Sequence, residues 1–208
     1  MEFWEFIILI VGSGTLAVFG TWFLNYFFVD KKKRGAEIIT TNRVLWMQKL
    51  RDNISEVIKC VATFNEKISF LNDTDEKMLL EMEKFRLAKA QIFLLLNYDG
   101  CKDDEIKRIL ETMEVTLTAV RINLLLFKMG NEPNEDIIRK QRLVLVPGIE
   151  YLTFISSIYL KCEWERTKKF AKFGEGFEFN FEREFDGYYS KRKELLDELK
   201  NAFYVKHK

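Results

Sequence analysis

The pattern of apolar and polar positions changes sharply near the start of the chain. Residues 6–29 are 24 consecutive positions without a charged side chain. As a helix rising about 1.5 Å per residue, this run spans roughly 36 Å, enough to cross a hydrocarbon core of about 30 Å with some tilt. A cleaved signal peptide has a shorter apolar region and small residues at its end, whereas Tyr26, Phe27 and Phe28 stand there in this chain. We therefore predict an N-terminal transmembrane helix.

A basic cluster follows the apolar run. It consists of Lys31, Lys32, Lys33 and Arg34, whereas the preceding flank, MEFWE, holds acidic residues and no basic one. Because Lys and Arg are retained on the cytoplasmic side of a membrane, we predict that the N-terminus lies outside and residues 31–208 lie in the cytoplasm. The cluster then marks the membrane edge and favours anionic lipid, and a nucleic-acid patch is the less favoured interpretation.

Several small or polar residues interrupt the apolar run. They are Gly12, Ser13, Ala17, Gly20, Thr21 and Asn25. Ser13, Ala17 and Gly20 share one helical face, and small residues on one face let helices approach closely in lipid. This pattern favours a homo-oligomer whose spans pack together, although glycine is also simply tolerated in spans. Asn25 could pair across a subunit interface or reach the lipid headgroups.

After the basic cluster, apolar residues recur at steps of three and four, the period of an amphipathic helix. The pattern predicts helices over residues 36–71, from the turn at 72–75 to Asn97, over 103–129 and over 134–172, with a kink or short break at Pro147. Short turns join these helices. We therefore predict an all-α protein, in which one transmembrane helix precedes a cytoplasmic up-down helical bundle.

The C-terminal part departs from this pattern. Between residues 174 and 187, phenylalanines alternate with polar residues, which is the period of a β-strand. A single strand needs a partner, so this segment could pair across subunits, cover a groove or remain a packed loop. A helix is predicted over 189–205. The predicted organisation is therefore an anchor with a basic edge over residues 1–34, a helical bundle over 35–172 and a C-terminal extension over 173–208.

Composition argues against most catalytic classes. The chain has 33 Lys and Arg against 32 Asp and Glu, so no strong field favours direct nucleic-acid binding. Its only histidine, His207, cannot supply a Ser-His-Asp set, a zinc helix or a di-iron bundle within the domain. Cys60, Cys101 and Cys162 lack metal-type spacing, and no glycine-rich phosphate loop is present. We expect a protein that is not an enzyme and holds neither metal nor cofactor.

Several polar or amphipathic residues border the apolar faces of the predicted helices. They are Arg43, Trp46, Arg51, Arg121, Asn123, Arg142, Trp164 and Arg166. One interpretation is that they form internal or subunit-interface pairs that fix the register of the helices. The other is that they line a path enclosed by several copies of the chain. We expect them at an interface or along such a path.

Three segments carry a resemblance to a known group of proteins. They are the stretch from Asn42 to Arg51 (NRVxWxxxLR), the LLLN stretch ending at Asn97, and KCEWER over residues 161–166. With the predicted span and helical bundle, residues 1–170 resemble small single-span bacterial proteins of antiphage systems, above all the accessory membrane proteins of type VI-B CRISPR systems. The motifs are short, and residues 171–208 look like an extension.

The resemblance implies a homo-oligomeric pore in the bacterial inner membrane, with a HEPN-like helical domain, that depolarises the membrane downstream of an RNA-guided defence nuclease. The HEPN ribonuclease motif is an Arg and a His separated by four to six intervening residues. Here Lys200, Asn201 and Ala202 occupy those positions before His207, so RNA cleavage by that chemistry is not expected. Two other hypotheses stay open: a membrane-tethered adaptor without pore activity, and an atypical nuclease dependent on Arg43, Arg51 or Arg121.

Overall fold

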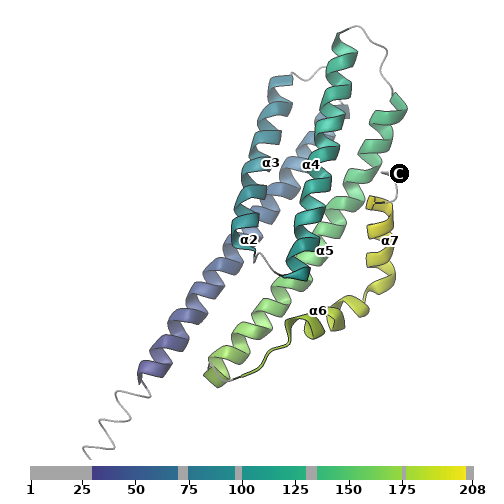
Figure 1. The fold of residues 1–208 in the computed structure, drawn as a ribbon. Helices are drawn as coiled ribbons and strands as arrows, with labels where there is room; N and C mark the ends of the chain where they lie inside the picture. Colours follow the sequence, from purple (N-terminus) through teal and green to yellow (C-terminus); the bar gives the residue numbers. More distant parts are fainter. Residues whose placement is uncertain (1–29, 70–74, 97–99, 130–134, 175–176, 205–208) are drawn as a thin grey trace, which may run out of the picture. The chain divides into compact units, whose positions relative to one another are not determined.

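The structure is a computed structural model that describes residues 30–69, 75–96, 100–129, 135–174 and 177–204. Within these ranges the regular secondary structure is helical, as predicted: α2 (Asp30–Ser69), α3 (Asp75–Leu95), α4 (Cys101–Lys128), α5 (Glu135–Phe173), α6 (Phe181–Ser190) and α7 (Lys193–Tyr204) (Figure 1). The predicted span, with its small residues from Gly12 to Asn25, lies outside the described residues. The basic residues 31–34 begin α2, but their side chains are likewise outside the description.

The chain divides into two compact units. The larger, called the bundle unit here, comprises Leu45–Arg166 and Phe179–Lys208, and the smaller comprises Met1–Val44 and Thr167–Glu178. The long helices α2 and α5 each contribute residues to both units. The sites discussed below lie within the bundle unit.

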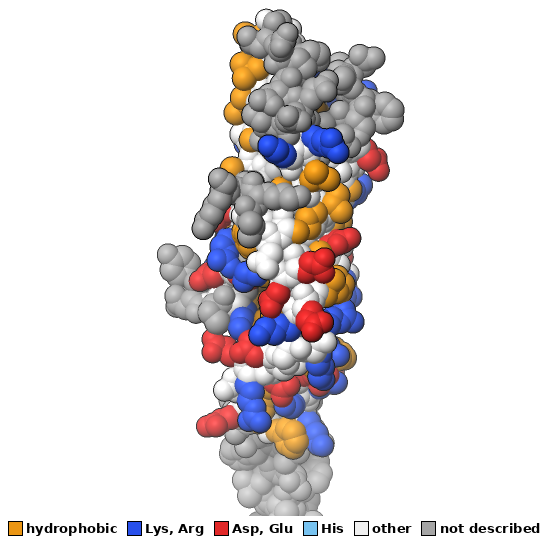
Figure 2. All heavy atoms as spheres, turned by 90° about the vertical axis from the view of Figure 1, so that its right-hand side faces the viewer, with side chains coloured by type: hydrophobic (Ala, Val, Ile, Leu, Met, Phe, Trp, Pro, Cys, Tyr) orange, Lys and Arg blue, Asp and Glu red, His pale blue; other side chains and the backbone are white. Residues whose placement is uncertain are grey.

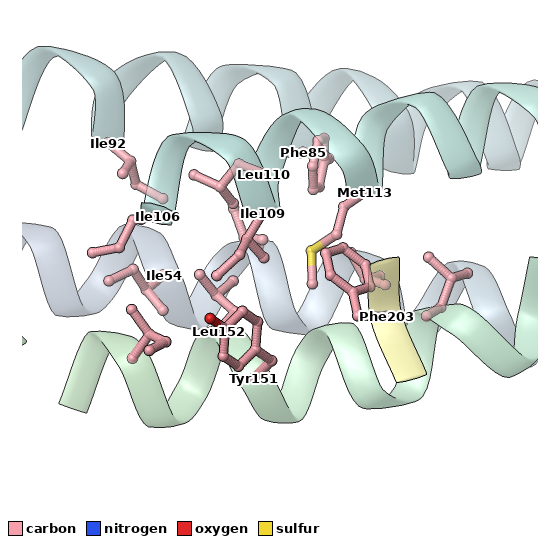
Figure 3. Packing of buried hydrophobic residues seen from close by; sticks show 14 of the residues in the cluster. Ile54, Phe85, Ile92, Ile106, Ile109, Leu110, Met113, Tyr151, Leu152 and Phe203 are labelled. Atoms are coloured by element: carbon pink, nitrogen blue, oxygen red, sulfur yellow. The ribbon is translucent and has the colours of Figure 1, made fainter. Parts of the chain in front are cut away.

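The core of the bundle unit follows from the apolar stripes of its helices. Figure 3 shows Ile54 of α2, Phe85 of α3, Met113 of α4 and Leu152 of α5 pointing into a shared interior, and these side chains are at most 5% exposed. Each stripe repeats at three or four residues, so one face of every helix is removed from water. Burying one such side chain stabilises the fold by about 1.5–3 kcal/mol.

Helix α5 runs unbroken through Pro147, so the short break considered from the sequence does not occur. The neighbouring Gly148 is buried against α7. A Cβ at this position would lie 2.6 Å from Cε2 of Phe203 and 3.2 Å from Cε of Met113. Glycine therefore lets the Phe203 ring lie directly against the backbone of α5, which is how α7 docks on the bundle.

The strand interpretation of residues 174–187 is wrong for the residues of this segment that the structure describes. Residues 177–180 carry no regular secondary structure, and α6 begins at Phe181. Asn180 caps this helix, since its side-chain oxygen accepts a hydrogen bond from the backbone N–H of Arg183 at 2.9 Å. A single strand has no hydrogen-bonding partner in an all-helical fold, whereas a helix satisfies its own backbone and places Phe181 and Phe185 on one face. The burial of these two side chains and their ring contacts favour the helix over the strand that the period-two pattern indicates.

The C-terminal end of α5 is marked by a glycine. Gly174 has φ of 75°, the left-handed conformation that glycine adopts without steric cost, and the chain turns there after Phe173. Beyond the turn, the ring of Phe177 meets that of Phe170 edge to face at 6.4 Å. Both residues belong to the smaller unit.

One described helical segment has the length and composition to cross a membrane. Leu143–Phe173 reaches a mean hydropathy of 1.6 over its most apolar window, half of which is buried inside the protein. Core helices of soluble bundles share these properties, so length and hydropathy alone carry little weight. Tyr151, Leu152, Ile155 and Tyr159 on this segment are at most 2% exposed, which is typical of a core helix.

Candidate functional site

The most developed polar cluster of the bundle unit centres on Glu105, near the start of α4. Its Oε1 accepts a hydrogen bond from the hydroxyl of Tyr151 on α5 at 2.6 Å. The Nζ of Lys200 on α7 lies 3.4 Å from the same oxygen, and the guanidinium of Arg108, one turn along α4, pairs with Oε2. The Glu105 side chain is only 17% exposed. One carboxylate thus joins α4, α5 and α7.

A second ion pair extends the cluster to α6. Nζ of Lys102 lies 2.6 Å from Oδ1 of Asp186 and 4.9 Å from the centre of the Phe185 ring. Glu105 and Lys102 are one helical turn apart, so both project to the same side of α4. This arrangement ties α6 to the first turns of α4.

Between these groups lies an open surface cavity of about 410 Å³. It is lined by Lys102, Glu105, Tyr151, Ile155, Phe185, Asp186, Tyr189 and Lys200. The lining carries two positive and two negative side chains, so it has no net formal charge and favours neither an anion nor a cation.

The protonation states follow from these contacts. Burial alone would raise the pKa of Glu105, but the hydrogen bond from Tyr151 and the charges of Lys200 and Arg108 outweigh it and hold that pKa below its usual value. Burial, with the adjacent Glu105 carboxylate, raises the pKa of Tyr151. Burial likewise raises the pKa of Tyr189 and of Tyr204 to about 12. At neutral pH the carboxylate is ionised and the phenols are protonated.

This arrangement suits a structural role better than catalysis. A general base needs a pKa near the working pH and a lone pair free to take a proton. The pKa of Glu105 is shifted away from neutrality, and both of its oxygens are engaged. Among the described residues, no group of three or more His, Cys, Asp or Glu side chains is placed to hold a metal ion. The cluster therefore fixes four helices together at one end of α4.

Trp46 is one of the residues predicted at an interface or path. In the structure, its side chain makes contacts inside the bundle unit. Its Nε1 donates a hydrogen bond to the backbone oxygen of Leu95 at 2.8 Å. Leu95 ends α3, where the last carbonyl groups of a helix have no partner within the helix. The indole also lies 6.3 Å from the Tyr159 ring. Trp46 thus joins α2 to α3 and α5.

The other predicted residues differ in their exposure and in the contacts that the structure describes for them. Arg51 is exposed and contacts Gln48 one turn before it, at 3.4 Å. Arg166 lies 3.5 Å from the buried Glu163 on its own helix, and Trp164 is 46% exposed. Arg43, Arg121 and Asn123 are half-buried, and each has an interaction partner. The side chain of Arg142 lies outside the described part of the chain.

Little in the sequence pointed to the Glu105 cluster. Glu105 and Tyr151 are 46 residues apart, and Lys102 and Asp186 are 84 apart. The one available signal was a tyrosine within the apolar stretch of α5, because a buried hydroxyl requires a hydrogen-bond partner. That signal predicts a partner without saying which residue supplies it.

The two predicted thiols that the structure describes are buried and unpaired. Cys60 and Cys162 are at most 1% exposed. Burial raises the pKa of Cys60 to about 11 and that of Cys162 to about 12. Both are therefore protonated and unreactive at neutral pH.

The surface in Figure 2 carries acidic and basic side chains interspersed along its length, with apolar side chains among them. Neither sign dominates this face, in keeping with a formal net charge of +1 for the chain.

Comparisons with protein families, with curated proteins and with solved structures found no match to this chain.

Proposed function

We propose that the chain is a single-span protein of the bacterial inner membrane whose copies assemble and form or gate a pore, depolarising the membrane during CRISPR-associated antiphage defence. The observation that carries the proposal is the uncharged run of residues 6–29, ended by four basic residues. A run of this length suffices for one crossing, and its charge asymmetry favours a cytoplasmic bundle.

Self-association is a requirement of the pore. One helix cannot enclose a path, and lipid-exposed backbone must satisfy its own hydrogen bonds, so several spans have to surround any channel. The face formed by Ser13, Ala17 and Gly20 supports close packing of these spans. The bundle unit supports the proposal less directly. Its Glu105 cluster holds helices together, which suits a domain whose role is to assemble with other copies.

A membrane-tethered adaptor is the second candidate. It is favoured by large apolar side chains that stay exposed on the bundle unit, among them Leu143 at 52% and Trp164 at 46%. Single exposed apolar residues are ordinary, but they would serve contact with another protein equally well.

The mass of the full-length protein in detergent, measured by light scattering, tests the proposal. A closed assembly of several copies is expected, whereas a monomer would exclude a pore. Gly20→Leu should reduce the assembly because it adds a large side chain to the small-residue face. Val18→Leu, expected on the opposite face of the helix, is the matched control and should leave the mass unchanged.

Depolarisation then tests the activity itself. Cells carrying the protein and its defence nuclease are challenged with phage, and a potential-sensitive dye reports the membrane potential. Loss of potential with the wild type and with Val18→Leu, but not with Gly20→Leu, is the expected result. An assembly that forms without any loss of potential would favour the adaptor.

A further inference from the structure

The outer face of α3 exposes a row of leucines at regular spacing. Leu80 is 50% exposed, Leu87 is 63% and Leu94 is 87% exposed. They are seven residues apart, so they fall on one stripe of the helix, opposite the buried stripe that includes Phe85 and Ile92. The row extends over about 21 Å of helix at 1.5 Å per residue. Scattered surface leucines need no explanation, but these three lie along one line of the helix, with the seven-residue repeat of one of the two apolar positions in a seam between packed helices.

Charged residues of opposite sign flank the row. Glu76 and Glu83 lie along one edge, and Lys77 and Lys84 lie along the other. All of these residues are exposed, and Lys84 also pairs with Glu81, three residues before it on the same helix, at 3.2 Å. Farther along the helix the flanking residues are the neutral Ala90 and Gln91.

The two edges determine which pairing of the row with itself is complementary. When two identical helices pack in parallel, the left edge of one faces the right edge of the other, so Glu83 of each copy faces Lys84 of its neighbour. When they pack antiparallel about Leu87, like edges face each other, and the charged half of each helix meets the neutral Ala90 and Gln91. Only the parallel arrangement matches charge with opposite charge.

We infer that the leucine row of α3 is a contact surface for a second copy of this chain, with the two α3 helices parallel. The inference rests on the proposed self-assembly and names one of its interfaces. The area of three leucines and their flanks is smaller than a standard stable interface, so the contact acts together with other contacts within the assembly. Parallel pairing is also compatible with copies that enter the membrane with one topology.

A similar spacing on α4 carries no such assignment. Val115, Ile122 and Met129 are exposed and seven residues apart, but Thr118, Ala119 and Leu126 beside them provide no paired rows of charge. Nothing there identifies an occupant.

Cysteine cross-linking of the full-length protein in membranes tests the orientation. In a Cys101→Ser background, the described thiols Cys60 and Cys162 are buried, so an added surface cysteine supplies the reactive group. Leu94→Cys should give a disulfide-linked dimer on oxidation, because the two residues 94 face each other in a parallel pair. Leu80→Cys should do the same. If Leu94→Cys reacts only when mixed with Leu80→Cys, the helices are antiparallel and the inference is wrong.

Charge exchange tests the flanks. Glu83→Lys and Lys84→Glu alone should each lower the yield of the Leu94→Cys dimer several-fold, since each sets like charges against each other. The double exchange should restore the yield, because the two edges are again complementary. Restoration would not occur if the substitutions acted only on the stability of α3.

A mass measurement separates failure of the interface from failure of the proposed function. Leu87→Lys should reduce the mass of the assembly in detergent, whereas Leu195→Lys, at an exposed leucine of α7, should not. If neither variant changes the mass of the assembly and Leu94→Cys gives no cross-link, the interface is refuted, whereas the proposed assembly is not. A monomeric wild type would overturn both. Loss of a different co-purifying protein in Leu87→Lys, at unchanged mass, would assign the row to that protein instead.

Discussion

The contact between Gly148 and Phe203 predicts that Gly148→Ala destabilises the bundle, although alanine is the better helix former. Gly148 lies within α5, where replacement of glycine by alanine should stabilise the helix by about 0.5–1 kcal/mol. The new Cβ would, however, lie 2.6 Å from Cε2 and 2.7 Å from Cδ2 of Phe203. These are atoms of a rigid, fully buried ring, so the ring, and α7 with it, must move.

The size of the effect can be bounded from both sides. Overpacking a core costs about 1–3 kcal/mol, so after the gain in helix propensity the net loss is between about 0 and 2.5 kcal/mol, and we expect a value near the middle of this range, about 1 kcal/mol. The loss cannot exceed the cost of releasing the Phe203 ring altogether, about 3–5 kcal/mol, because release of this ring removes the clash. For a chain of this size, 1 kcal/mol corresponds to about 2–4 °C in Tm.

The assay is thermal unfolding of the full-length protein in detergent, followed by circular dichroism at one scan rate. Gly187→Ala is the matched control: Gly187 lies within α6, and a Cβ there would meet nothing within 4 Å. We expect Tm to fall for Gly148→Ala and to rise slightly for Gly187→Ala. In a Phe203→Leu background the cost of Gly148→Ala should shrink, since the two residues are in contact. Equal stabilisation by both alanines would refute the reasoning.

The remaining predictions concern polar groups of the bundle unit. Glu105→Gln should lower the free energy of unfolding at neutral pH. Because the pKa of Glu105 is depressed in the folded protein, its carboxylate stabilises the fold above the ordinary pKa of 4.5, and this stabilisation is lost as the pH falls through the folded pKa. In urea unfolding at a series of acidic pH values, the free energy of unfolding of the variant should therefore fall less steeply than that of the wild type. Trp46→Phe should cost about 1–3 kcal/mol, read from the urea midpoint, because it leaves the oxygen of Leu95 without its donor, and the mass of the assembly should not change. Ser156→Ala should raise the urea midpoint, because the buried Oγ has no hydrogen-bond partner among the described residues; a lower midpoint would contradict this.

The helices themselves could be predicted from local pattern. A step of three or four between apolar residues is fixed by helix geometry, so the stripes that include Ile54, Met113 and Leu152 were readable without knowing their partners. Pro147 was harder to interpret, because the cost of proline in a helix depends on the surrounding packing. The segment at 174–187 failed for a related reason: its alternation of phenylalanines competes with the helical spacing of Phe181 and Phe185, and burial decided between them.

The polar clusters could not be predicted in the same way. The contact between Trp46 and Leu95, like that between Glu105 and Tyr151, joins residues on different helices, and no local period specifies which turns of two helices lie side by side. Sequence reasoning placed Trp46 among the residues expected at an interface or along a path, and the structure gives its indole N–H a partner inside the bundle unit. That reasoning could not distinguish an internal partner from a neighbouring subunit, because both satisfy the same indole N–H.

The contacts of Tyr151 also help to decide which of the two apolar segments, Leu143–Phe173 or residues 6–29, enters the membrane. If Leu143–Phe173 crossed the bilayer, Tyr151 would carry its hydrogen bond to Glu105, and with it Arg108 and Lys200, into the hydrocarbon core. Charged groups at that depth are costly, and the buried apolar face of α5 would exchange its contacts with the bundle for lipid. Residues 6–29 carry no charged side chain at all, and a basic cluster ends the run. The proposed crossing by residues 6–29 would keep the charged groups of the Glu105 cluster out of the lipid, which is why we propose this run and not Leu143–Phe173 as the span.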